Sequence, residues 1–319
     1  MKYTRRRLIT LFIALATFVA VLAPTPAQAT YQHKAKRQLT VMSRNIYLGA
    51  SLTPAITAQT PDEFAAALGG ILGEFQATDY EARSGALANE ILATQPDLIG
   101  LQEVSIWTFD TPAGTVVIDF LDILQLQLAG RGLSYSVAAV SDNADIGPLP
   151  VGDNFVRFQD RDVILKNDAT EGLEITGSDS GRYEAQQLLP TPLGVAISFD
   201  RGWAYVDGTY KGREFRFINT HLEVDGFAAV QEAQTAEFLA GPARKRGTVI
   251  AVGDFNSPVD GSTTASYEML TERWRFRDAW RGKSRNQGLT CCFDSALADP
   301  SSELTTRIDL ILVKGWAWA

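Results

Sequence analysis

Short apolar segments that end in polar residues limit this chain to a small set of folds. In "PDLIGLQEV" the apolar run from Leu98 to Leu101 is followed by Gln102 and Glu103. In "VIAVGDFNSP" an uncharged run gives way to Asp254 and Asn256 just before a proline. Runs of this length with turn residues at their ends indicate buried strands. Because strand ends meet at the rim of a sheet, the pattern predicts a site assembled there from distant segments.

Helical segments lie between these strands. In "TPDEFAAALGGILGEF" Thr60 is a typical N-cap, Pro61 follows at the first helical position, and Glu63 completes a capping box. A second helix is expected from about Tyr80, and "VVIDFLDILQLQLAG" predicts a helix that closes near residue 130, before a strand through residue 140. Further on, "LGVAISFD", "GWAYVDGTY" and "REFRFINTHLE" read as short strands, and residues 227–239 as a helix. Mixed strands with interspersed helices predict two packed sheets with helices outside them, an α/β sandwich.

The first residues predict export. Lys2 and the arginines at 5–7 precede an apolar run from residue 8 to 22, and "TPAQA" then supplies small residues up to Ala29. This is the pattern of a secretory signal, cut after Ala29. A membrane anchor is the alternative, but the run is shorter than the ~20 residues that a bilayer requires. We expect a polar leader at 30–38, one domain over 39–319, and a secreted protein without a membrane span after cleavage.

The exported chain is acidic. Removal of residues 1–29 takes four of the 29 basic residues and none of the 37 acidic ones, which leaves 25 against 37 and a net charge of −12. Such a balance disfavours a general electrostatic attraction to nucleic acid or to anionic membranes. Divalent cations suit this surface better than polyanions do.

Both cysteines of the chain, Cys291 and Cys292, are adjacent. Neighbouring Cα atoms lie ~3.8 Å apart across a trans peptide, closer than ordinary disulfide geometry prefers. We therefore expect two small, partly buried thiols. A strained disulfide between them and an intermolecular bridge are the alternatives, since an oxidising compartment permits both.

Five polar residues at predicted strand ends are candidates for chemistry: Asn45, Glu103, His221, Asp254 and Asn256. Each has an ordinary explanation when taken singly, as a turn residue, a solvated carboxylate, a core histidine or an Asx-turn. Their joint occurrence at the ends of apolar strands indicates a shared site.

The motifs that carry these residues resemble a known family. "SRNIYLG", "PDLIGLQEV", "DRDVILKN", "INTHLE", "VGDFNSP" and "RIDLILV" occur in that order between about residues 39 and 313. In this order they are similar to the successive motifs of the endonuclease/exonuclease/phosphatase superfamily, which includes deoxyribonucleases, abasic-site endonucleases, sphingomyelinases and inositol polyphosphate phosphatases. The resemblance implies a four-layered α/β sandwich with two mostly antiparallel sheets and a site at one sheet rim.

The resemblance also implies roles for the candidate residues. Glu103 would be the principal ligand of Mg²⁺, or of Mn²⁺ or Ca²⁺ in its place, with Asn45 beside it. His221 would donate a hydrogen bond to the phosphate oxygens. Asp254 would orient or deprotonate the attacking water, and Asn256 would hold Asp254 and a phosphate oxygen in place. The implied reaction is in-line displacement at phosphorus by water.

Asp309, within "RIDLILV", corresponds to a family aspartate that accepts a hydrogen bond from a catalytic histidine in a later "SDH" motif. The sequence ends at residue 319 without that motif, and His33, in the polar leader, is not assigned the role. We expect a truncated or frameshifted version of a longer product. The alternative is a protein that has lost its last strand and much of its activity, with Trp316 and Trp318 covering part of a sheet edge.

The substrate class stays open among nucleic acid, phospholipid head group and soluble phosphate ester. The leading hypothesis is a monomeric, Mg²⁺-dependent phosphoesterase. Its alternatives are an impaired domain that binds phosphorylated ligands, and a sphingomyelinase-like phosphodiesterase, which the lack of an aromatic lipid-binding hairpin disfavours. Arg161 stands close before "VIL", near where some family members have a tyrosine. We expect it to reach a phosphate or to pair with Asp160 or Asp162.

Overall fold

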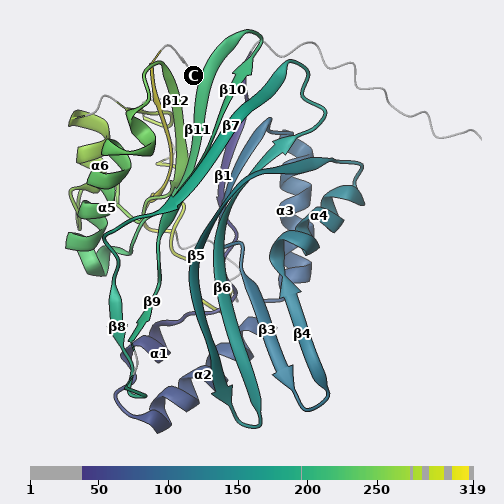
Figure 1. Cartoon of the computed structure of the whole chain (residues 1–319), viewed down its shortest axis with the longest axis vertical. Coiled ribbons are helices and arrows are strands. Elements are labelled where there is room, and N and C mark those ends of the chain that lie inside the picture. Colours follow the sequence, from purple (N-terminus) through teal and green to yellow (C-terminus); the bar gives the residue numbers. More distant parts are fainter. Residues whose placement is uncertain (1–37, 195, 274–275, 282–286, 298–303, 316–319) are drawn as a thin grey trace, which may run out of the picture. The chain divides into compact units, whose positions relative to one another are not determined.

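A computed structural model describes residues 38–194, 196–273, 276–281, 287–297 and 304–315 (Figure 1). The predicted signal, nearly all of the polar leader with His33, and the tail residues Trp316 and Trp318 lie outside these ranges. Among the helices that the ranges contain, none has the length and apolar character needed to cross a bilayer.

The first sheet is built around the long strand β6. Its strands follow the order β1, β2, β6, β3, β4, and β5 pairs with the other edge of β6. β1 and β2 run parallel, and the remaining pairs are antiparallel. The strands are β1 (Val41–Asn45), β2 (Leu98–Gln102), β3 (Ile106–Thr111), β4 (Gly114–Asp119), β5 (Tyr135–Val151) and β6 (Asn154–Asn167).

The second sheet has the order β13, β14, β12, β11, β10, β7. Only β11 and β12 run parallel in it. Two short strands, β8 (Leu188–Pro190) and β9 (Ala196–Ser198), pair with each other as a separate hairpin. The strands of the second sheet are β7 (Leu173–Arg182), β10 (Gly202–Tyr210), β11 (Arg213–His221), β12 (Thr248–Asp254), β13 (Arg277–Asp278) and β14 (Asp309–Lys314).

Six helices cover the sheets within the described ranges. The predicted capping box is present, since the Thr60 side chain accepts the Glu63 N–H and Glu63 accepts the Thr60 N–H in return. The second helix begins at Tyr80 as expected. The helices are α1 (Thr53–Thr57), α2 (Pro61–Ala77), α3 (Tyr80–Thr94), α4 (Phe120–Ala129), α5 (Ala228–Ala240) and α6 (Ser266–Glu268).

Three groups of buried apolar side chains separate four layers. One group lies between helices α1–α4 and the first sheet, one between the two sheets, and one between the second sheet and α5. Figure 1 shows α3 and α4 on one side of the sheets and α5 and α6 on the other. The predicted four-layered α/β sandwich with two mostly antiparallel sheets is confirmed. All five residues of β2 are buried, which explains the run without polar side chains from Leu98 to Leu101.

Two sequence-based expectations were wrong in detail. The segment expected to form one helix up to residue 130 begins instead with strand β4, and α4 starts only at Phe120. Asp119 divides the two elements, because its carboxylate accepts the N–H groups of Leu121 and Asp122 as an N-cap. The strand expected in "LGVAISFD" is reduced to the three residues of β9, and β5 extends beyond residue 140 to Val151.

Candidate active site

Strand register brings the predicted residues to one rim of both sheets. Asn45 stands opposite Gln102 at the ends of β1 and β2, and Asp254 stands opposite both His221 and Asp309 in the second sheet. A buried Asn219 ties the sheets together just beneath this rim. Its amide donates to the carbonyl oxygens of residues 101 and 163 (2.8 and 3.2 Å) and accepts from Gln102 Nε2 (2.6 Å).

Three carboxylates, which we call the cleft trio, face a common cleft at this rim: Glu103, Asp254 and Asp309. The Asn45 side chain lies between two of them, because its Nδ2 donates to Glu103 Oε1 (2.9 Å) and to Asp254 Oδ2 (3.1 Å). The backbone N–H of Leu48 donates to Glu103 Oε2 at 2.6 Å. One amide nitrogen therefore holds two carboxylates from different sheets in a fixed relation.

Backbone conformations at the rim are unusual. Tyr47, Glu103 and Asn256 have φ angles of 61°, 58° and 48°, in the left-handed region. Asparagine tolerates this region, whereas tyrosine and glutamate adopt it at a cost of about 1–3 kcal/mol each. The strain at Glu103 places its carboxylate toward Asn45, and the turn at Asn256 lets its N–H donate to Asp254 Oδ1 at 2.9 Å.

His221 lies behind the cleft with only 1% of its surface exposed. Asn256 Nδ2 is 3.1 Å from its Nε2, and the Arg201 guanidinium is 3.0 Å from its Nδ1. Its Nε2 is 3.8 Å from Asp254 Oδ2. Burial and the charge of Arg201 lower the pKa of His221 well below its ordinary value, so the imidazole is neutral.

Two further carboxylates were not predicted as site residues. Asp160 and Asp162, which we call the buried pair, point from β6 toward His221, and one ligand atom of each lies within 4.8 Å of the others. Both Asp162 oxygens and Asp160 Oδ1 have no hydrogen-bond partner among the described residues. Their alternation along "QDRDVIL" was visible in the sequence, but no local signal showed that they meet His221.

The pKa values of four aspartates in this region are raised. Burial, and then the charge of Glu103, raises the pKa of Asp160 to about 7, and burial with the charge of Asp160 raises that of Asp162 well above its ordinary value. Burial likewise raises the pKa of Asp254 to about 6. Burial and the adjacent Asp254 raise the pKa of Asp309 to about 8. A bound cation would oppose these shifts.

Arg161 is not brought to the rim. Its guanidinium lies 2.6 Å from Asp119 Oδ1 and donates to the backbone oxygen of Val104 at 3.0 Å. It thus contacts the N-terminus of α4, and neither Asp160 nor Asp162 is its partner.

Two clefts meet at Glu103. The first, the carboxylate cleft, contains the trio, Asn45 and Asn256, and the space inside it is about 1510 Å³ including its open mouth. The second, the Arg201 cleft, is lined by Glu103, Asp160 and Arg201 and measures about 820 Å³ in the same sense. His221 lines neither cleft, since Asn256 and Arg201 stand in front of it.

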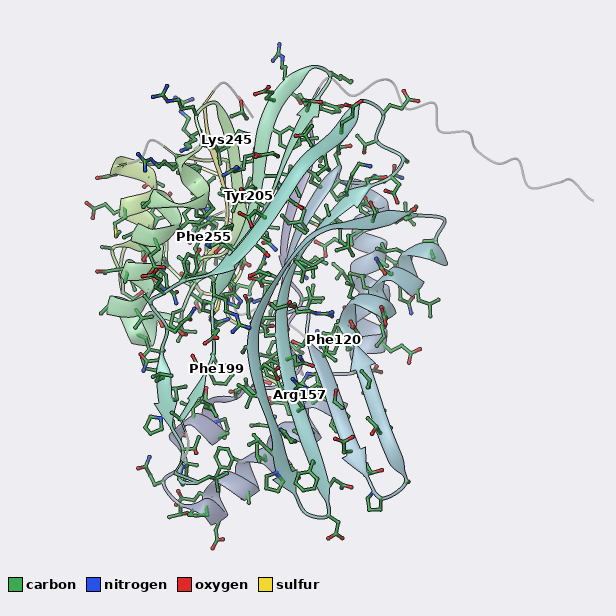
Figure 2. The ribbon with its side chains drawn as sticks, viewed as in Figure 1. Phe120, Arg157, Phe199, Tyr205, Lys245 and Phe255 are labelled. Atoms are coloured by element: carbon green, nitrogen blue, oxygen red, sulfur yellow. A yellow bond between two sulfur atoms is a disulfide. The ribbon has the colours of Figure 1, made fainter. Side chains whose placement is uncertain are left out.

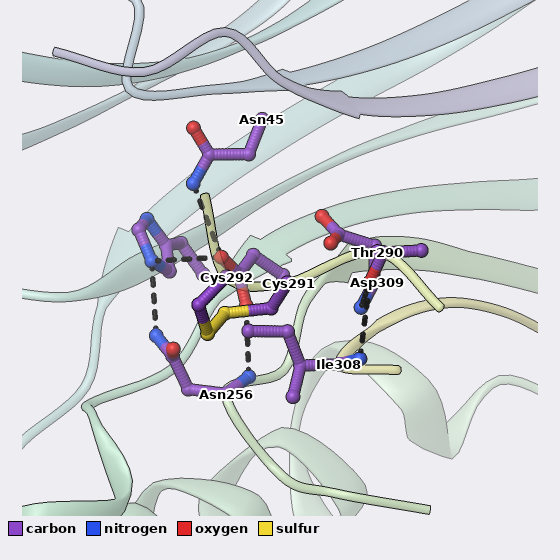
Figure 3. The surroundings of a disulfide bond; sticks show 9 residues. Asn45, Asn256, Thr290, Cys291, Cys292, Ile308 and Asp309 are labelled. Carbon is purple, nitrogen blue, oxygen red and sulfur yellow. Dashed lines mark hydrogen bonds and ion pairs between the residues drawn. A yellow bond between two sulfur atoms is a disulfide. The ribbon is translucent and has the colours of Figure 1, made fainter. Parts of the chain in front are cut away.

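Cys291 and Cys292 form a disulfide with each other. The expectation of two free thiols was therefore wrong, and the intramolecular alternative holds. Figure 3 shows the disulfide beside Asn256, Ile308 and Asp309 in the wall of the carboxylate cleft. The preceding Thr290 supports Asp309, because its Oγ1 accepts the N–H groups of Ile308 (3.2 Å) and Asp309 (3.1 Å).

Comparison with known proteins agrees with this geometry. The family model described as Endonuclease/Exonuclease/phosphatase family matches residues 67–319, most of the chain. The chain belongs to the endonuclease/exonuclease/phosphatase family. Members of this family are hydrolytic phosphoesterases. No curated protein matches the chain.

Several solved structures of the endonuclease/exonuclease/phosphatase fold are similar. The catalytic domain of human nocturnin with a bound sulfate anion has a TM-score of 0.52 at 19% identity, over 86% of this chain and 81% of that one. A family protein from Leptotrichia buccalis has a TM-score of 0.52 at 15% identity, over 86% and 88%. D. rerio TDP2 complexed with a single-strand DNA product has a TM-score of 0.51 at 14% identity, over 88% and 85%. At these identities the likeness shows the fold.

Endonuclease/exonuclease/phosphatase enzymes depend on divalent metal, and the rim fits such an ion. The trio offers hard oxygen ligands, and Asp309 Oδ1 is buried without a hydrogen-bond partner among the described residues. The raised pKa values of Asp254 and Asp309 include repulsion from neighbouring carboxylates, which a cation would relieve. Asp160, Asp162 and His221 form a second group whose atoms lie close enough for an ion.

Proposed function

We propose that the chain hydrolyses a phosphate ester by in-line attack of water, with Mg²⁺ as the cation and Mn²⁺ or Ca²⁺ as alternatives. The observation that carries this proposal is the meeting of Glu103, Asp254 and Asp309 at one rim, with Asn45 joining two of them across the sheets.

Glu103 would hold the cation, which when bound neutralises charge on the phosphoryl and leaving oxygens. Asn45 directs its NH₂ group to Glu103 and Asp254, while its oxygen accepts the Tyr47 N–H at 2.8 Å. We therefore propose that Asn45 sets the spacing of the two carboxylates, and that its oxygen is offered to the cation only if the amide turns over.

Asp254 would accept the proton of the attacking water. Its Oδ1 accepts the Asn256 N–H and its Oδ2 accepts the Asn45 amide at 3.1 Å, so each oxygen keeps one acceptor position for a proton. A carboxylate with a pKa of about 6 is a stronger base than an ordinary aspartate and is still ionised at neutral pH.

His221 would act from behind the cleft. A neutral imidazole has one N–H to donate to a phosphate oxygen, but Asn256 or Arg201 would have to move aside first, because they stand between the ring and the clefts. In the present geometry His221 fixes the amide of Asn256, which also donates to the Leu222 oxygen at 2.9 Å. Arg201 adds positive charge beside the imidazole. Arg161 is left out of the proposed site because its guanidinium is engaged by Asp119 and Val104.

The two clefts on either side of Glu103 favour a phosphodiester over a phosphomonoester. A diester carries a group on each side of the phosphorus, and each cleft offers space for one of them. A phosphomonoester would need only one of the two spaces.

A catalytically impaired domain that binds phosphorylated ligands is the second candidate. The observation that favours it is Asp309, whose Oδ1 has no partner among the described residues although the family role of this aspartate is to hold a histidine. Such a domain would bind phosphate esters without turnover.

One assay separates the candidates. Residues 30–319 are purified and tested on bis(p-nitrophenyl) phosphate, p-nitrophenyl phosphate, DNA and sphingomyelin, with Mg²⁺ and with EDTA. Metal-dependent release of product that Glu103→Ala abolishes would support the enzyme, and Glu90→Ala, at the outer rim of the same cleft, is the matched control. Binding of phosphate esters without turnover on any substrate would favour the binding domain.

We also propose that the protein is exported through the signal at residues 1–29 and acts as a monomer. N-terminal sequencing of the protein recovered from the culture medium should begin at Thr30. Light scattering should give the mass of one chain. A protein retained with the cells and starting at Met1 would contradict the first proposal, and a dimer mass the second.

A further inference from the structure

The disulfide in the wall of the carboxylate cleft has no part in the catalytic proposal. Cys291 and Cys292 are the only cysteines of the chain, and they are bonded to each other. Both line the cleft, together with Asn256 and Asp309. Cys291 is half-buried and Cys292 is exposed. A reductant in solution can therefore reach this bond from the Cys292 side, and the chain contains no other cysteine that it could affect.

The backbone of Cys291 is hydrogen-bonded to the segment that carries Asp309. Its N–H donates to the Thr306 oxygen at 3.0 Å, and its own oxygen accepts the Thr306 N–H at 3.1 Å. The preceding residue, Thr290, accepts the N–H group of Asp309 on its side-chain oxygen at 3.1 Å. A change in the backbone at Cys291 is therefore passed to Asp309 through a single intervening residue.

The segment that follows the disulfide is attached to the first sheet. The Tyr47 hydroxyl donates to the Ser295 oxygen at 2.7 Å, and the Tyr47 N–H donates to Asn45 Oδ1 at 2.8 Å. Asn45 in turn contacts Glu103 and Asp254. Residues 290–297, which we call the cleft loop, thus connect the end of the second sheet with the end of the first, with the disulfide between the two attachments.

Reduction must move at least one of the two sulfur atoms. The sulfurs of a dithiol cannot stay within bonding distance, since non-bonded heavy atoms settle at roughly 3.5–4 Å. The wall behind them is packed, because the Phe255 N–H donates to the Ile308 oxygen at 3.0 Å and the Phe255 ring meets Phe238 of α5 edge-on. Figure 2 shows Phe255 on the side of the second sheet that α5 covers. A close-packed interior yields little, so the displaced sulfur moves toward the cleft and Asn256.

From these contacts we propose that the Cys291–Cys292 disulfide is a reversible redox site that regulates the cation site beside it. In the oxidised protein the cleft loop holds Asp309 in place. In the reduced protein Asp309 and Asn256 are held less firmly, so the cation binds more weakly. The proposal rests on the proposed phosphoesterase function, and it deepens that function by naming a regulation of the same site.

The exchange requires a dithiol, or two molecules of a thiol, as the reductant. A thiolate of the reductant attacks the Cys292 sulfur, the S–S bond breaks, and Cys291 leaves as a thiolate that takes a proton from water. A second thiolate of the reductant then attacks the reductant's own sulfur in the mixed disulfide and releases Cys292 in the same way. In total two electrons and two protons pass to the protein, and the reductant becomes a disulfide.

Mg²⁺ binding and amide hydrogen exchange test the proposal without turnover. The protein is reduced with dithiothreitol and freed of it under argon, and its thiols are counted. The Mg²⁺ dissociation constant from calorimetry should rise by about 10- to 100-fold, the loss expected when a preorganised site is displaced by roughly 1 Å. The N–H groups of Thr306 and Asp309 should exchange faster, because their hydrogen bonds to Cys291 and Thr290 are weakened.

The redox equilibrium of the same bond provides an independent measurement. If reduction weakens Mg²⁺ binding by a given factor, saturating Mg²⁺ must stabilise the disulfide by the same factor, because binding and reduction form a closed thermodynamic cycle. The oxidised fraction in graded glutathione buffers is measured by alkylation and mass spectrometry, with Mg²⁺ and with EDTA. An equilibrium that Mg²⁺ does not shift would overturn the proposal.

Two variants separate the bond from side effects of the reductant. The double variant Cys291→Ala, Cys292→Ala should bind Mg²⁺ as weakly as the reduced parent, with or without dithiothreitol. Phe293→Ala, at a 49% exposed position of the same loop, keeps the bond and should keep the response to the reductant. A double variant that binds Mg²⁺ as tightly as the oxidised parent would contradict the proposal.

A bond that resists excess dithiothreitol in the folded protein would also overturn the proposal, as would a fully reduced protein with the Mg²⁺ affinity and hydrogen exchange of the oxidised one. Hydrolysis of bis(p-nitrophenyl) phosphate is measured in both redox states. Equal turnover in the two states, with equal Mg²⁺ binding, removes the redox site and leaves the phosphoesterase. Redox-dependent Mg²⁺ binding without turnover in either state removes the phosphoesterase and leaves the redox site.

Discussion

The cleft trio and the buried pair contain the same chemical group in opposite settings. Glu103 and Asp254 accept hydrogen bonds from Asn45, Leu48 and Asn256 and border a cleft. Three of the four oxygens of Asp160 and Asp162 accept no hydrogen bond from the described residues, and Asp162 is fully buried. The difference teaches that Glu103 and Asp254 are held by hydrogen bonds where a cation can reach them, whereas those three oxygens of the pair, like Asp309 Oδ1, are buried without a hydrogen-bond donor among the described residues, which favours the protonated form.

Substitution of Glu103 is expected to have the largest effect on catalysis. Glu103→Gln keeps an oxygen for Asn45 but removes the charge and turns an NH₂ group toward the Leu48 N–H. We expect kcat/KM on a phosphodiester to fall by about 10³-fold, equivalent to ~4 kcal/mol. Calorimetry should show weaker Mg²⁺ binding in the same variant. Glu90→Gln, 45% exposed in its side chain, should stay close to the parent in both measurements.

Substitution of Thr290 removes the backbone support of Asp309 while leaving every carboxylate of the trio in place. Thr290→Val removes the acceptor of two backbone N–H groups beside Asp309, which should lower the free energy of unfolding by about 1–3 kcal/mol. Chemical denaturation measures this loss, and Thr290→Ser should recover most of it. A stable valine variant with parent activity would mean that Asp309 needs no such support.

The pH dependence of stability shows whether Asp309 binds a proton in the folded protein. With the pKa of Asp309 raised to about 8, the folded protein binds more protons than the unfolded chain between about pH 4 and pH 8. The stabilisation is complete below pH 4 and is lost as the pH rises through 8. Between pH 6.5 and 8.5 the Tm of the metal-free protein should fall by roughly 2–4 °C. His221 opposes this trend only near pH 6.5, where its imidazole is partly protonated in the unfolded chain but not in the folded protein.

Two controls accompany the pH series. Mg²⁺ should reduce the dependence, since a cation favours the ionised trio. Asp309→Asn should reduce it without metal and leave the part that comes from Asp160 and Asp162. A metal-free Tm that rises over the same window would contradict the raised pKa of Asp309.

The smallest effect is expected from Asp162→Asn. An amide has the shape of a protonated carboxyl group, so the free energy of unfolding should change by less than about 1 kcal/mol at neutral pH. Thermal unfolding of the variant and of Asp254→Asn gives the contrast between the two groups. A large loss of stability in Asp162→Asn would show that the pair is charged and would break the distinction.

Much of the fold was visible in the sequence because its signals are local. The capping box of Thr60 and Glu63, the start at Tyr80 and the apolar run of β2 depend on neighbouring residues and were predicted correctly. The start of α4 was misplaced because the β-branched residues before Asp119 pair with β3, a contact between separate segments.

The predicted site residues converge for a simple reason, which is that strand ends share a rim. Register brings His221, Asp254 and Asp309 side by side, as their positions in the motifs implied. Arg201 and the buried pair were missed because their proximity to His221 depends on how two sheets pack. The disulfide was only the alternative to two thiols because adjacency in the sequence argued against it.

Asn45 has a consequence for the kinetics of activation. Its single NH₂ group occupies the space between Glu103 and Asp254, where an incoming cation would draw the two carboxylates together. If Glu103 and Asp254 together hold the cation, the Asn45 amide would have to give up these hydrogen bonds first, and the observed rate of metal association should then reach a plateau at high Mg²⁺ concentration. The plateau rate would equal the rate at which the Asn45 amide breaks its hydrogen bonds to Glu103 and Asp254.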